Sequence, residues 1–92
     1  MQSITVRVIG KPGCHLCDEA DLVVTDVVQK FSNVVVEHRS LFEETAWESE
    51  YSDKIPVILI DGHEFAHWRV DAEALSAALL SRGGLPEASE SE

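Results

Sequence analysis

Cys14 and Cys17 are the two cysteines of this 92-residue chain, and they stand three positions apart in the segment Cys-His-Leu-Cys. Two thiols at this spacing can form a disulfide with each other or provide two ligands to a metal ion. The chain has no other cysteines with which to build a network of structural disulfides. The pair therefore indicates a site of thiol chemistry, with redox exchange and metal binding as the two candidates.

The neighbouring residues predict where this pair lies in the fold. Glycine and proline make residues 10–13 a loop, and apolar residues at helical spacing begin just after Cys14. At a helix start, free N–H groups and the positive end of the helix dipole stabilise a thiolate. Lys11, and His15 when protonated, add positive charge nearby. We expect Cys14 to attack a substrate disulfide and the deeper Cys17 to resolve the mixed disulfide.

The hydrophobic pattern predicts four strands and three helices. Alternating or continuous apolar runs predict the strands, and apolar residues at i, i+3, i+4 and i+7 predict the helices. The predicted strands are residues 4–9, 34–38, 57–60 and 63–66. The predicted helices are residues 15–31, residues 41–51 behind a capping box of Ser40 and Glu43, and a last helix that Asp71 caps and Gly83-Gly84 end.

The order of these elements, β-α-β-α-β-β-α, predicts an α/β fold. The first β-α-β unit implies two parallel strands with a right-handed crossover, and the dipeptide Asp61-Gly62 implies an antiparallel hairpin. We therefore expect a four-stranded mixed sheet flanked by helices. The domain is expected to span residues 1–82, followed by an acidic, flexible tail over residues 83–92.

Composition limits the partners of this domain. It has 17 acidic side chains and 7 basic ones, for a formal net charge of -10. Nucleic acids and anionic membranes require a basic surface, so neither is an expected partner. No signal peptide or membrane-spanning apolar run is visible, and a close cysteine pair suits a reducing compartment. We expect a cytoplasmic monomer.

Together, these features resemble the glutaredoxin-like branch of the thioredoxin fold, over about residues 4–82. The resemblance depends on the element order, on Ile55-Pro56-Val57 at the third strand, and on the motif Lys11-Pro12-Gly13-Cys14-His15-Leu16-Cys17. The form Cys-x-Leu-Cys-x-x-Ala, which ends here at Ala20, is similar to a subfamily of small glutaredoxin-like proteins.

The resemblance implies roles for individual residues. Cys14 matches the family's nucleophile and Cys17 its resolving cysteine. Pro56 matches a cis-proline beside the dithiol, and the backbone of Ile55 would pair with a substrate strand. Lys11 matches the lysine before the family's cysteines, and Asp71 matches an acidic residue at the start of the last helix. Lys54 is a further candidate to contact a substrate carboxylate.

The chain departs from the family at the turn before the last helix. Glutathione-using glutaredoxins have two glycines there, whereas this chain has Trp68 and Arg69. No bound cofactor is expected. A protein disulfide and glutathione both remain candidate partners, with glutathione a candidate reductant. Arg69 could still bind a carboxylate, and Trp68 is expected near the dithiol.

Two other functions compete with a redox enzyme. The same cysteines could hold zinc with His63 and His67, or an iron–sulfur cluster between two subunits. Alternatively, the domain could be a redox-inert adaptor that binds partners through its acidic surface. Trp47 and Tyr51, four residues apart on the predicted second helix, are expected to pack into the core rather than to form a site.

Overall fold

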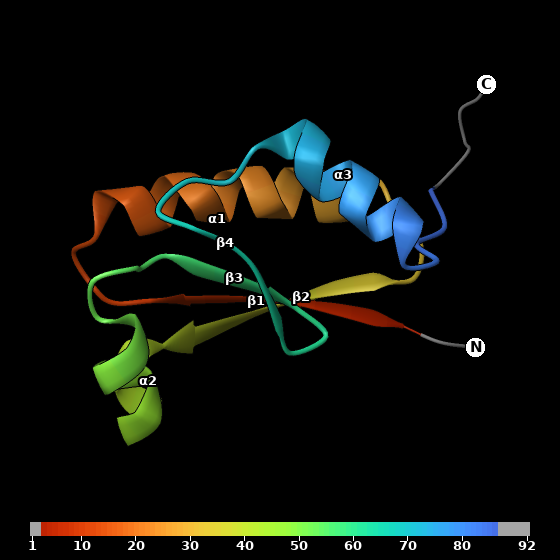
Figure 1. The fold of residues 1–92 in the computed structure, drawn as a ribbon. Coiled ribbons are helices and arrows are strands. Elements are labelled where there is room, and N and C mark those ends of the chain that lie inside the picture. The colour runs from red at the N-terminus through yellow and green to blue at the C-terminus, as the bar shows by residue number, and fades with distance from the viewer. Residues whose placement is uncertain (1–2, 87–92) are drawn as a thin grey trace.

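The computed structural model describes residues 3–86, which form a four-stranded sheet with helices on both faces (Figure 1). In chain order the elements are β1 (Ile4–Gly10), α1 (His15–Val28), β2 (Val34–Ser40), the 3-10 helix η1 (Leu41–Glu43), α2 (Thr45–Tyr51), β3 (Val57–Ile60), β4 (His63–His67) and α3 (Ala72–Ser81). The predicted α/β class and element order are confirmed. No described helix is long and apolar enough to cross a membrane.

The strands lie in the order β2-β1-β3-β4. β1 runs parallel to β2, with Gly10 opposite Ser40, as the β-α-β unit predicts. β3 runs antiparallel to β1, with Val57 opposite Ile9. The β3–β4 hairpin turns at Asp61 and Gly62, which both have positive φ. The sheet is therefore mixed. The C-terminal ends of β1 and β2 and the start of β3 lie at the same end of the sheet.

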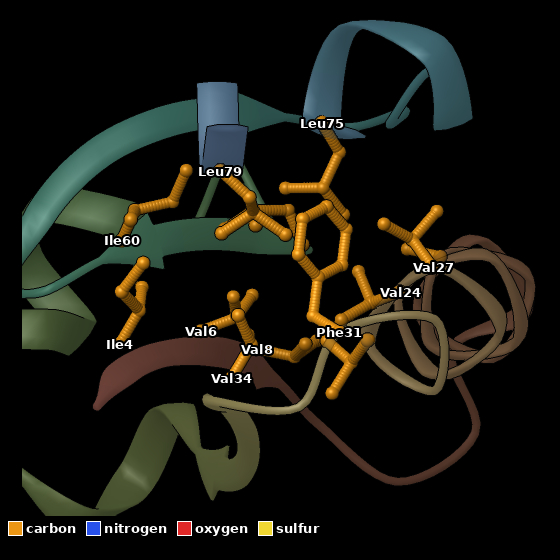
Figure 2. Packing of buried hydrophobic residues seen from close by; sticks show 13 residues of the cluster. Ile4, Val6, Val8, Val24, Val27, Phe31, Val34, Ile60, Leu75 and Leu79 are labelled. Carbon is orange, nitrogen blue, oxygen red and sulfur yellow. The ribbon is translucent and has the colours of Figure 1, made fainter. Parts of the chain in front are cut away.

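Two apolar clusters hold the helices to the sheet. The larger one joins the sheet to α1 and α3, and Figure 2 shows its side chains in the layer between them. It includes the fully buried Val6, Val24, Ile58, Leu75 and Leu79. On the opposite face, η1 and α2 pack through a smaller cluster of Ile9, Leu41, Val57 and Leu59, joined by Trp47, Tyr51 and Ile55. The core packing predicted for Trp47 and Tyr51 is confirmed.

Two helices are shorter than predicted. α1 ends at Val28 rather than at Phe31, because the Lys30 and Phe31 N–H groups donate to carbonyls three residues back in a tighter turn. Phe31 is nevertheless buried, which explains why the apolar pattern extended that far. The predicted helix 41–51 is two elements, because Glu44 has an extended backbone (φ -135°, ψ 134°). The Ser40 and Glu43 capping box is present, but it caps η1.

Residues just beyond the predicted domain end at residue 82 still pack on the fold. Gly84 packs so closely that a Cβ there would lie 2.8 Å from the Leu79 carbonyl oxygen and 2.9 Å from the Phe31 ring. The Ser32 N–H donates to the Leu85 carbonyl (2.8 Å), and the Leu85 N–H donates to Asn33 Oδ1 (2.8 Å). The packed domain therefore continues to residue 86, and the rest of the predicted tail, 87–92, lies outside the described residues.

Candidate functional site

The cysteine pair lies where the chain leaves β1 and enters α1. Cys14 is the N-cap of α1, with an extended backbone, and it forms a disulfide with Cys17 at a Cα–Cα distance of 5.2 Å. Cys14 Sγ accepts a hydrogen bond from the Cys17 N–H (3.1 Å). A sulfur thus occupies the position usually held by a serine or aspartate oxygen. In the reduced protein, the same N–H group favours a Cys14 thiolate over a thiol.

The two sulfurs differ in access to solvent. Cys14 is partly exposed, whereas Cys17 is 8% exposed and faces the core side of α1. An incoming disulfide can therefore reach Cys14 more easily than Cys17. The order expected from the sequence, with Cys14 first and Cys17 second, agrees with this difference.

Gly10 is part of the site, although the sequence indicated it only as a loop residue. A Cβ at Gly10 would lie 2.8 Å from Cys17 Sγ and 3.1 Å from Cys17 Cβ. Any side chain here would collide with the buried cysteine. The signal that could have revealed this role was its place four residues before Cys14, at the end of a strand.

Lys11 and His15 flank the pair and are both exposed. Lys11 lines a depression beside Cys17, together with Pro12. No ion pair within residues 3–86 includes Lys11 or His15. Both side chains are thus open to solvent beside the cysteine segment, and their contribution to the reactivity of the dithiol stays a prediction.

Ile55 and Pro56 lie at the same end of the sheet as the dithiol, just before β3 begins. The register of Val57 opposite Ile9 places Pro56 beside Gly10, against which the Cys17 side chain lies. The Ile55–Pro56 peptide bond is cis, as the resemblance implied. Within the described residues, no hydrogen bond uses the backbone N–H or C=O of Ile55. These two groups are free to pair with another chain.

Trp68 joins the loop after β4 to the loop before β3. Its indole Nε1–H donates to the Asp53 carbonyl (2.7 Å), and its backbone N–H donates to the Pro56 carbonyl (2.9 Å). Trp68 has a left-handed backbone, with φ 67°, which these bonds stabilise. With Arg69 and Leu16 it lines a shallow pocket of about 150 Å³ against α1. The structure thus brings Trp68 and Arg69 close to the Cys-His-Leu-Cys segment.

Asp71 is the N-cap of α3, as predicted. Its Oδ2 accepts a hydrogen bond from the Ala74 N–H (2.9 Å). This carboxylate therefore already has a structural role, and its part in substrate binding stays a prediction. Lys54 contributes its carbonyl to the Trp68 N–H (3.3 Å) rather than a side-chain contact to the site.

The histidines expected in a zinc site do not gather around the cysteines. His63 and His67 both lie on β4, where His67 Nδ1 contacts Glu64 Oε2 at 3.3 Å. In the part of the chain that the structure describes, no group of three or more His, Cys, Asp or Glu residues could hold a metal ion.

Comparison with solved structures defines the class of this protein. It resembles protein Ne2328 of Nitrosomonas europaea, with a TM-score of 0.71 and 22% identity over 85% of this chain and 93% of that one. It also resembles target protein XcR50 of X. campestris, with a TM-score of 0.67 and 26% identity over 83% and 96% of the two chains. A thioredoxin of Halobacterium salinarum matches with a TM-score of 0.63 and 19% identity over 87% and 74%. The chain is thus a thioredoxin-fold protein with a disulfide-forming cysteine pair.

The family follows from its sequence. The model of the glutaredoxin-like domain (DUF836) matches residues 5–80, and the chain belongs to this family. No curated protein sequence matches it significantly. The fold and the cysteine pair support a general thiol–disulfide redox role.

Proposed function

We propose that this protein is a cytoplasmic, monomeric thiol–disulfide oxidoreductase that reduces substrate disulfides through Cys14 and Cys17. One observation carries the proposal: a disulfide-forming pair at the start of α1, with one sulfur accessible and the other nearly buried. That inequality suits a two-step exchange in which each cysteine has a separate task.

The reaction runs through a mixed disulfide. The Cys14 thiolate attacks one substrate sulfur, a Cys14–substrate bond forms, and the other substrate sulfur leaves with the electron pair. The Cys17 thiolate then attacks Cys14 Sγ, which forms the Cys14–Cys17 disulfide and releases the second substrate thiol. The substrate gains two electrons. An external thiol such as glutathione would reduce the protein again.

The surroundings of the pair favour an extended protein segment as substrate. The unpaired backbone groups of Ile55, next to Pro56, can form hydrogen bonds with such a segment in the manner of an added strand. Lys11 would attract a substrate carboxylate, and Asp71 at the start of α3 a substrate amine.

Two cysteine variants test the proposal, each as the other's control. We expect reduced Cys14→Ser to consume a small aromatic disulfide, such as 5,5′-dithiobis(2-nitrobenzoate), only at the reagent's background rate, because its accessible nucleophile is gone. Cys17→Ser should retain the first attack, release one equivalent of coloured thiol and remain as a mixed disulfide, measured by absorbance and intact mass. Undiminished exchange by Cys14→Ser would refute the proposal.

A further inference from the structure

A depression of about 290 Å³ lies beside Cys17, between α1 and the ends of β1 and β2. The strand register explains its floor. Val8 pairs with His38 and Gly10 with Ser40, so the side chains of His38 and Ser40 point to the face that α1 covers. Because Gly10 has no side chain, the depression extends to the Cys17 sulfur that lies against it.

The depression contains a histidine–aspartate pair. His38 Nε2 forms a hydrogen bond with Asp21 Oδ1. Asp21 follows Cys17 by four residues, so the two side chains lie one above the other on the same face of α1. The side chains of His38 and Asp21 are 55% and 42% exposed, which lets the pair exchange protons with bulk water.

The proposed reaction needs a proton acceptor at this point. Cys17 must lose its thiol proton before it can attack Cys14, and a nearly buried thiol resists ionisation. A neutral imidazole whose Nε2–H is donated to a carboxylate has an Nδ1 lone pair that can accept a proton. The depression is large enough for several water molecules, each of about 30 Å³, to connect the thiol with this pair.

We propose that His38, oriented by Asp21, is the general base that removes the proton from Cys17 during resolution of the mixed disulfide; this inference rests on the proposed function. The Cys17 proton passes to His38, the Cys17–Cys14 bond forms, and the Cys14–substrate bond breaks. The departing substrate thiolate takes the electron pair, and His38 then returns its proton to solvent. No further oxidant or reductant is needed in this step.

Other charged groups also face the depression. Lys11, from the loop, favours a Cys17 thiolate, whereas Asp18 and Asp21, on α1, disfavour it. Arg39 also borders the depression, but its guanidinium forms ion pairs with Glu37 and Glu43. Electrostatics alone therefore predicts that Asp21→Asn speeds the ionisation of Cys17. The general-base proposal predicts the opposite, because Asp21→Asn removes the carboxylate that orients His38. The two explanations thus differ in the sign of one measurement.

The test follows both steps with 5,5′-dithiobis(2-nitrobenzoate) at one equivalent of reduced protein. The first release of coloured thiol reports Cys14 attack and depends on reagent concentration, whereas the second reports Cys17 resolution and does not. General bases contribute about 10²- to 10⁴-fold, and since water also accepts protons, we expect His38→Asn and Asp21→Asn to slow the second phase at least about tenfold near pH 7. The first phase should be unchanged.

The pH profile separates a proton acceptor from a purely structural role. Hydroxide can remove the Cys17 proton directly once the pH is high enough, so the second-phase rates of His38→Asn and wild-type protein should converge as the pH rises. His63→Asn, on β4, and Asp26→Asn, on the Lys30 side of α1, are matched controls and should behave as wild type. Equal second-phase rates in all variants, or a faster one in Asp21→Asn, would overturn the inference. Loss of the first phase in wild-type protein would refute the proposed function instead.

Discussion

At the scale of single residues, the site depends on how closely Gly10 approaches Cys17. The glycine's backbone forms part of the wall behind the buried sulfur, where a Cβ would lie 2.8 Å away. Its φ is not positive, so the requirement for glycine comes from space rather than from backbone conformation. The position of the Cys17 sulfur is therefore fixed by the end of β1 as well as by α1.

Gly10→Ala should destabilise the protein. The added methyl group forces the sulfur or the strand to move, and overpacking of this kind costs about 1–3 kcal/mol. Urea denaturation of wild-type and variant protein, both oxidised, would measure the change in the free energy of unfolding.

The Cys17→Ala background provides the control for this substitution. Without the sulfur, the added methyl group of Gly10→Ala meets only the Cβ position of residue 17, at 3.1 Å. The loss of unfolding free energy caused by Gly10→Ala should therefore fall by about half or more in a double-mutant cycle, with all four proteins measured under reducing conditions. An equal cost in both backgrounds would mean that the strain arises elsewhere.

The sequence predicted the dithiol but not all of its surroundings. Cys14 and Cys17 were identifiable because spacing and a helix start are local properties of the chain. The role of Gly10 and the His38–Asp21 contact were not, because both depend on how β1, β2 and α1 pack together. The residue spacing within one segment does not specify which side chains of different strands and helices come into contact.

At the scale of elements, Trp68 connects the loop before β3 to the loop before α3. Its indole bond to the Asp53 carbonyl and its backbone bond to the Pro56 carbonyl join two segments that carry expected substrate contacts. Trp68 and Arg69 stand where glutathione-using glutaredoxins have two glycines. The bulky residue thus supports the loop around Ile55.

Trp68→Phe should loosen this connection while retaining an aromatic ring. Loss of the Nε1–H bond leaves the Asp53 carbonyl to solvent and should cost about 0.5–1.5 kcal/mol in the free energy of unfolding. Amide hydrogen exchange should quicken at Lys54, whose N–H donates to the Tyr51 carbonyl (2.7 Å). Leu85→Ala, a change at the opposite end of the sheet, should leave exchange at Lys54 unaltered. An exchange rate at Lys54 that is the same in Trp68→Phe and wild-type protein would contradict this supporting role.

Ion pairs between β1 and β2 give the fold a dependence on acid. Arg7 Nε donates to Glu37 Oε1 (3.0 Å), and this hydrogen bond, with the charges of Arg7 and Arg39, lowers the pKa of Glu37. A carboxyl whose pKa is lowered by folding stabilises the native state above its unfolded pKa. That contribution is lost as the pH falls from the ordinary glutamate value of 4.5 through the lowered one.

Glu37→Gln should therefore reduce the fall in melting temperature between about pH 7 and about pH 3. Most of the difference from wild type should be present above the ordinary glutamate value of 4.5 and should vanish in stronger acid. Glu48→Gln, an exposed residue of α2 with no ion pair among residues 3–86, is the matched control. Parallel melting curves for wild type and Glu37→Gln across this range would contradict the assignment.

The predicted second helix shows why element boundaries were harder than element order. The capping box of Ser40 and Glu43 was predicted, yet it closes only the short η1 before Glu44 turns extended. Helical spacing of Trp47 and Tyr51 still marked the face that packs on the sheet. Periodicity thus located the buried side correctly, whereas the break depended on fitting two short pieces over Ile9 and Val57.

At the scale of the whole molecule, the net charge of -10 should steer charged substrates. We expect reduced protein to react several-fold faster with the dicationic disulfide cystamine than with dianionic dithiodipropionate. The ratio should shrink between about 0.01 M and about 1 M salt, as the screening length falls from about 30 Å to about 3 Å. Each stopped-flow rate would be divided by the rate at which dithiothreitol reduces the same disulfide, which corrects for the intrinsic reactivity of that disulfide. A ratio of rates that stays constant as the salt concentration rises would show that electrostatic steering does not operate.

Topology was the most predictable property of the whole molecule. Right-handed crossover and the Asp61-Gly62 turn together led to the mixed sheet that is observed. The end of the domain was not predictable in the same way, because Gly83 and Gly84 end α3 without ending the packing. Beyond α3, Leu85 forms long-range hydrogen bonds with Ser32 and Asn33.

The hydrogen bonds around Asn33 have a practical consequence for attaching the protein to a surface. The Asn33 carbonyl accepts a hydrogen bond from the Ile4 N–H, and the Asn33 side chain accepts one from the Leu85 N–H. Both ends of the described chain therefore lie on the same side of the molecule (Figure 1). β1 then spans seven residues, about 23 Å at 3.3 Å each, before it reaches the dithiol loop. A handle joined at either end would leave the sulfurs facing outward, which suits this domain to an electrode or a sensor chip.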